Sequence, residues 1–92
     1  MSLAQEKLEA IVFYLAEHVP DAHIKILPLQ EASTVYVLNV RMPSRHLRLE
    51  IGRPLIEDMN HSVEKVRQYL DRDKLDQEIQ RFNRSEYSWH PV

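Results

Sequence analysis

The sequence predicts a single small α+β domain, residues 1–92, with a three-stranded antiparallel meander and helices packed on one face of the sheet. Its composition, 43% apolar and 28% charged residues in a chain of 92, is typical of one globular domain. Apolar residues recur at helical spacing before residue 20 and after residue 54, and with a period of two between them. The predicted order of elements is α-β-β-β-α-α.

The first predicted element is a helix over residues 4–19, ended by Pro20 and Asp21. Phe13 falls on the acidic side of this helix, opposite its apolar face, so the aromatic ring is expected to need a partner. The apolar face consists of Ala4, Leu8, Ile11, Val12, Leu15 and Val19.

Two strands follow from a period of two, over residues 33–42 and 45–52. A two-residue turn at Pro43-Ser44 would pair every residue n with residue 87 − n. This register also brings apolar side chains opposite one another, so turn chemistry and periodicity predict the same hairpin. The expected apolar pairs are Val40 with Leu47, Leu38 with Leu49, and Tyr36 with Ile51.

A preceding strand is predicted over residues 22–29, at the edge of the sheet because Pro28 lacks a backbone N–H. A loop centred on Glu31 would pair residue n with residue 62 − n. In that register His23 lies beside Asn39, and Lys25 lies beside Val37, on the face away from the helices.

Two more helices are predicted, over residues 55–71 and 74–84, with Asp73 capping the second. Residues 85–92 form a C-terminal tail without periodicity. Its two large aromatic side chains are expected to pack on the domain or on a partner. Residues 1–3 are interpreted as a candidate leader.

The composition also limits location and chemistry. Without cysteine the chain has no disulfide, no thiolate nucleophile and no sulfur-based zinc site. The longest apolar run, residues 10–16, is far shorter than the roughly 20 residues that cross a bilayer. No export signal is recognisable, so a cytoplasmic protein without a membrane partner is expected.

No catalytic motif stands out. One glycine cannot build a nucleophile elbow, a phosphate loop or a dinucleotide fingerprint. The pairs Glu57/His61 and Asp21/His23 lack the ligand density that makes a zinc motif specific. We therefore predict no catalytic residue, no metal and no cofactor, and a protein that is not an enzyme.

The leading functional interpretation is a protein-interaction module that is expected to form a homodimer, with docking of another protein as the second form of binding. The sheet face away from the helices carries more apolar side chains than a solvated face requires, and such surface usually marks an interface. The interface candidates are Phe13, Leu27, Val35, Val37, Tyr87 and Trp89.

The alternative interpretation is anion or nucleic-acid binding. The chain has a net charge of −2, yet residues 41–53 contain four arginines and only one glutamate. Single-strand binding also needs stacking aromatic rings, which this sheet face lacks, so nucleic acid ranks second to protein. The anion-binding candidates are Arg41, Arg45, His46, Arg48 and Arg53.

Overall fold

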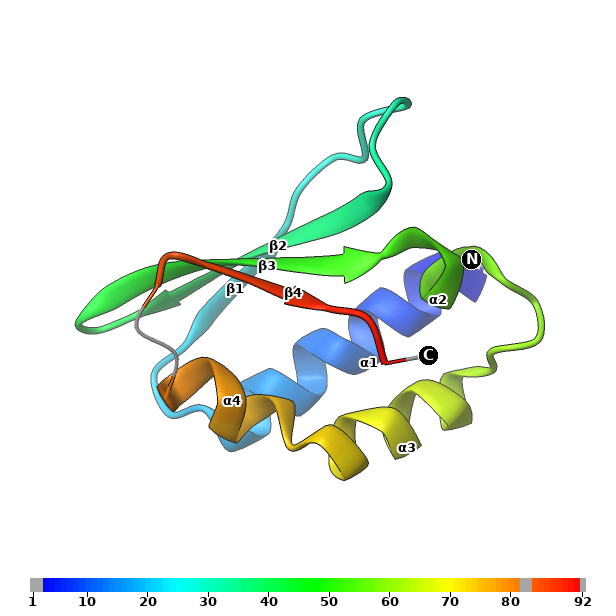
Figure 1. Ribbon diagram of the computed structural model, residues 1–92. Coiled ribbons are helices and arrows are strands. Elements are labelled where there is room, and N and C mark those ends of the chain that lie inside the picture. Colours follow the sequence, from blue (N-terminus) through cyan, green and yellow to red (C-terminus); the bar gives the residue numbers. More distant parts are fainter. Residues whose placement is uncertain (1–2, 82–83, 92) are drawn as a thin grey trace.

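A computed structural model describes residues 3–81 and 84–91, which form two layers: a twisted sheet and a layer of helices on one of its faces (Figure 1). The α+β class and the one-sided helix packing are thereby confirmed. The elements are α1 Leu3–His18, β1 His23–Ile26, β2 Val35–Met42, β3 Arg45–Gly52, α2 Arg53–Glu57, α3 Val63–Asp73, α4 Leu75–Arg81 and β4 Glu86–Trp89.

The sheet has four strands in the order β1-β2-β3-β4, so the prediction of a three-stranded antiparallel meander is wrong. The first three strands are antiparallel, but β4 runs parallel to β3. A parallel neighbour is reached by a long crossover, here through α2, α3 and α4, and no turn signal announces it. At four residues, β4 is also too short to show a clear period.

The β2–β3 hairpin has the predicted register. Its pairs run from Met42 with Arg45 at the turn to Val35 with Gly52 at the far end. Tyr36, Leu38 and Val40 are buried beneath the helices, as periodicity predicted.

The register of β1 differs from the prediction by two residues. His23 pairs with Arg41, and Ile26 pairs with Leu38, so residue n pairs with 64 − n. Because side chains alternate with a period of two, a two-residue shift keeps every side chain on its expected face. The strand ends before Pro28, and the loop of residues 27–34 takes up the difference.

One long helix was predicted over residues 55–71, but α2 and α3 are separate. Ser62 caps α3, its Oγ accepting a hydrogen bond from the Lys65 amide at 3.1 Å. The fully buried Lys7 ammonium donates to the carbonyls of Leu55 at 3.0 Å and Asp58 at 2.8 Å. It thereby caps the C-terminal end of α2, where helix carbonyls otherwise lack donors.

The helix predicted over residues 74–84 is observed as α4. Lys74, with φ of 50° and ψ of 55°, adopts the left-handed conformation that ends α3. Residues 82–83 lie outside the described part of the chain. Asp73, predicted as a cap, instead has its carboxylate 2.7 Å from Arg72 Nε and 3.0 Å from the Trp89 Nε1 donor.

The tail packs on the domain rather than extending from it. Trp89 is 3% exposed and belongs to the core, and Arg72 Nη2 donates to the Pro91 carbonyl at 2.7 Å. At the other end, Leu3 begins α1, while the rest of the candidate leader, residues 1–2, lies outside the described residues. Within the described ranges, no helix is long and apolar enough to cross a membrane.

Candidate functional site

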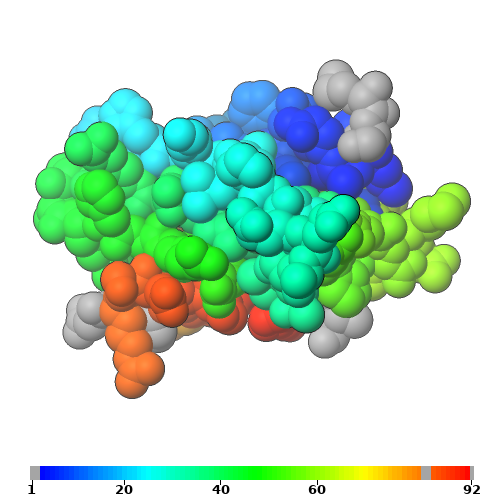
Figure 2. Space-filling view, turned by 90° about the horizontal axis from the view of Figure 1, so that it is seen from above, coloured from blue at the N-terminus to red at the C-terminus, as the bar shows by residue number. Residues whose placement is uncertain are grey.

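The side of the sheet opposite the helices is the candidate functional site, and we call it the open face. None of the described helices covers it (Figure 1), and Figure 2 views the molecule from this side. The outward side chains come from all four strands and from the loop after β1. They are His23, Lys25, Leu27, Val35, Val37, Asn39, Arg41, His46, Arg48, Glu50, Glu86 and Ser88.

Positive charge gathers at the end of the open face near the β2–β3 turn. The observed register places His23, Arg41 and His46 in one row across the sheet. The next row contains Lys25, Asn39, Arg48 and Glu86. The two-residue shift of β1 therefore moves His23 and Lys25 toward the arginines. We call the five side chains His23, Lys25, Arg41, His46 and Arg48 the basic end.

Most of this charge is not neutralised on the face. Arg48 Nε lies 3.3 Å from Glu50 Oε2, and Ser88 Oγ donates to Glu50 Oε1 at 2.9 Å. The Arg48 side chain is still 47% exposed, and exposed pairs of this kind contribute little stability. In the described part of the chain, no carboxylate lies within ion-pair distance of Lys25 or Arg41.

Two of the five anion-binding candidates do not share the open face. Arg45 lies on the helix side of β3 and donates to the Ile79 carbonyl near the end of α4. Arg53 Nε lies 2.7 Å from Glu57 Oε1, and its Nη1 donates to the carbonyls of Glu31 and Ser33 at 3.2 and 3.1 Å. The hydrogen bond from Arg53, and then that from Tyr36, lowers the pKa of the Glu57 carboxyl.

The open face is hollowed in two adjoining places. A hollow of about 240 Å³, the basic hollow, lies between Arg41, His46 and Glu86. A second of about 190 Å³, the apolar hollow, lies against the loop after β1. Arg48 borders both. The apolar hollow is lined by Leu27, Pro28, Leu29, Gln30, Ser33, Val35, Val37 and Arg48.

The structure brings together only half of the predicted interface residues. Leu27, Val35 and Val37 are partly buried and line the apolar hollow. Phe13, 66% exposed, lies in the helical layer at a hollow between α1 and α3. Trp89 lies in the core, and Tyr87 is partly buried against it, so neither joins the open face.

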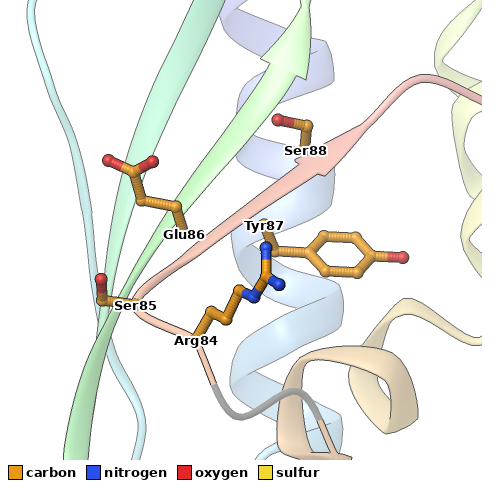
Figure 3. A pocket seen from close by; sticks show the side chains of 5 residues that line it. All are labelled: Arg84, Ser85, Glu86, Tyr87 and Ser88. Atoms are coloured by element: carbon orange, nitrogen blue, oxygen red, sulfur yellow. The ribbon is translucent and has the colours of Figure 1, made fainter.

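A further hollow, of about 640 Å³, follows the β4 edge and is lined by Arg84, Ser85, Glu86, Tyr87 and Ser88. Tyr87 and Glu86 point to opposite sides of the strand (Figure 3). Burial is the main cause that raises the pKa of the Tyr87 hydroxyl.

His23 and Lys25 are site residues that the interpretation of the sequence did not include. Strand periodicity placed them on the correct face, but only the observed register shows that they lie beside Arg41 and Asn39. Leu27, directly after β1, continues this register by donating its amide to the Val37 carbonyl at 3.0 Å, and no local sequence signal reports it.

Metal-binding side chains do not converge on the open face. Among residues 3–81 and 84–91, no group of three or more His, Cys, Asp or Glu side chains could hold a metal ion. His61, between α2 and α3, has a buried Nδ1 without a hydrogen-bond partner in the described structure, and its Nε2 lies 3.8 Å from Asp58 Oδ2.

Comparison with known proteins gave no match to a family model, a curated protein or a solved structure.

Proposed function

We propose that this protein is a non-catalytic interaction module that binds a partner protein through the open face. One observation carries the proposal. The uncovered side of the sheet is divided into an apolar hollow and a basic end, which meet at Arg48.

The apolar hollow beside the basic end distinguishes this face from a sheet face that is simply solvated. An antiparallel sheet can leave one face in water, and polar side chains then cover that face. Here Leu27, Val35 and Val37 lie together beside a hollow, away from the core. Adjacent apolar side chains with a polar, charged rim are the usual anatomy of a protein–protein interface.

A different protein fits this face better than a second copy. In a symmetric dimer whose two-fold axis runs along the strands, the two basic ends would lie on each other, which like charges oppose. An axis across the strands would lay the basic end of each copy on the apolar end of the other, so the exposed arginines would meet apolar side chains instead of carboxylates. Neither arrangement gives the basic end an acidic partner, and we place homodimerisation second among the forms of protein binding.

Anion or nucleic-acid binding is the second candidate function. The row of His23, Arg41 and His46, next to the basic hollow, favours it. Phosphate contacts would make this binding strongly salt-dependent. A fluorescein-labelled single-stranded oligonucleotide at low salt tests it, and saturable binding that Arg41→Glu abolishes would replace protein binding as the conclusion.

Site-specific photo-crosslinking in cells tests the proposed function. A benzophenone amino acid replaces Val37 on the open face and, as the matched control, Glu64 on the opposite layer in α3. We expect one discrete adduct from position 37 and none from position 64. The same adduct should disappear when Arg41→Glu is added to the position-37 variant.

Two outcomes would contradict the proposal: no adduct from position 37, or equal adducts from both positions. Light scattering of the purified protein tests homodimerisation, the other form of protein binding. We expect a monomer, whereas a stable dimer that Val37→Glu dissociates would assign the open face to a second copy.

A further inference from the structure

We infer that the open face takes an extended acidic segment of its partner, with one large aliphatic side chain followed by carboxylates two and four residues later. This inference rests on the proposed function and specifies the partner's chemistry. It follows from the size of the apolar hollow, the spacing of the rows and the charge of the basic end.

The apolar hollow sets the first position of the segment. Val35 and Val37 lie on β2, and residues 27–30 contribute the opposite wall. At about 190 Å³ the hollow is smaller than pockets for drug-sized ligands, roughly 300–1,000 Å³. One leucine-sized side chain fits such a volume, and apolar walls favour it over a polar one.

Strand geometry sets the spacing of the carboxylates. Along β2, Val37, Asn39 and Arg41 are successive outward residues, and each step of two residues spans about 6.7 Å. A peptide extended along the strands advances by the same amount per two residues. A carboxylate two residues beyond the anchor therefore reaches the row of Lys25 and Arg48, and one four residues beyond reaches the row of Arg41.

Cations outnumber carboxylates at both positions and so favour an acidic segment: Lys25 and Arg48 share their row with one carboxylate, Glu86, and the described row of Arg41 holds none. Lys25 and Arg41 are exposed and, within the described residues, have no carboxylate partner in ion-pair distance. Arg48 gives one interaction to Glu50 and retains exposed guanidinium donors. Arginine donors match carboxylate geometry, and complementary charge across an interface provides specificity.

Two other occupants fit less well. Nucleic acid would use the basic end but leave the apolar hollow empty, and no Phe, Tyr or Trp ring lies among the outward residues of the open face for base stacking. A second copy could offer Phe13 with Glu9 and Glu17, but Phe13 belongs to the opposite layer. Such head-to-tail contacts generate open stacks unless they close into a ring.

Fluorescence anisotropy with synthetic peptides tests the inference. The probe is a fluorescein-labelled nine-residue peptide with Leu-Ser-Glu-Ser-Glu at its centre. We expect saturable binding that weakens at least tenfold when Leu is replaced by Ser, when both Glu are replaced by Lys, or when salt rises from 50 to 500 mM.

Variants of the protein locate the binding. Arg41→Glu and Val37→Asp should each weaken binding at least tenfold, while Lys65→Glu on α3 should leave it unchanged. Circular dichroism melting confirms that each variant is folded. Lys65 is a matched control because it is an exposed cation on the opposite layer.

The outcomes separate this inference from the proposed function. If photo-crosslinking from Val37 succeeds but the acidic peptide does not bind, the open face is an interface and the acidic segment is wrong. If an oligonucleotide of equal charge displaces the peptide and binds more tightly, nucleic acid is the ligand. If Lys65→Glu weakens binding as much as Arg41→Glu does, the basic end is not the binding surface.

Discussion

Lys7 shows how one buried charge organises the helical layer. Its ammonium is fully buried, and burial lowers its pKa, while the nearby Asp58 carboxylate acts in the opposite direction. The two carbonyl acceptors come from the C-terminal end of α2 and the residue after it. A lysine within an apolar helix face gives no sequence signal that it will cap another helix.

Removing the Lys7 ammonium should destabilise the protein. Lys7→Met keeps most of the apolar stem but leaves the carbonyls of Leu55 and Asp58 without their donor, a loss of about 1–3 kcal/mol. Urea denaturation measures the free energy of unfolding. Lys65→Met, which removes an exposed ammonium, is the control, and equal stability of both variants would contradict the role of Lys7.

Asp73 gives a pH dependence that Trp89 can report. The hydrogen bond from Arg72 is the main cause that lowers the pKa of Asp73, and the bond from Trp89 acts in the same direction. A folded-state pKa below the unfolded one means that this stabilisation is complete above the unfolded pKa, about 4. It is lost as the pH falls through the folded-state pKa.

The fluorescence of Trp89, the one tryptophan of the chain, should therefore stay constant from neutral pH down to about 4 and change below it. Asp73→Asn should remove this transition while the protein remains folded at neutral pH. A fluorescence change centred near pH 6 would contradict this assignment, as would an unchanged transition in Asp73→Asn.

At the scale of elements, the sequence predicted correctly those elements whose limits are set by residues close together in the chain. The Pro43-Ser44 turn and the alternating side chains specify the β2–β3 hairpin, and all eight pairs have the predicted register. The α1 helix likewise lies within one residue of its predicted limits. In both elements, consecutive residues determine where the element begins, where it ends and which face is buried.

Elements that depend on distant contacts were not predicted. The split between α2 and α3 depends on Lys7, which is far away in the sequence. The loop after β1, which takes up the two-residue difference in register, is held by Arg53 from the start of α2. In the parallel strand β4, Trp89 lies in the core and donates to Asp73, a contact that no period reveals.

The loop after β1 should be ordered mainly by Arg53. This side chain joins the Glu31 and Ser33 carbonyls to Glu57, whose other oxygen accepts from the Tyr36 hydroxyl at 2.7 Å. Arg53→Met should therefore speed hydrogen exchange of backbone amides within residues 27–34, because the loop loses two hydrogen bonds, those to the Glu31 and Ser33 carbonyls. Arg67→Met on α3 is the control, and unchanged exchange in Arg53→Met would contradict this role.

At the scale of the molecule, positive charge is concentrated on the exposed side of the sheet layer. The chain carries a net charge of −2, yet the open face collects three Lys or Arg side chains and two histidines against Glu50 and Glu86. The arginine-rich segment is evident in the sequence, but the division of its arginines between the two sides of the sheet is not. Arg45 and Arg53 hold the fold together, while Arg41 and Arg48 remain on the surface.

Amide chemical-shift mapping tests the open face most directly. The ¹⁵N-labelled protein is titrated with the Leu-Ser-Glu-Ser-Glu peptide, and the amide signals of the helical layer serve as the internal control. We expect the largest shifts at Lys25, Val37, Asn39, Arg41 and Arg48, and none along α3. Shifts confined to the hollow between α1 and α3 around Phe13, or no shifts at millimolar peptide, would contradict the open face as the binding surface.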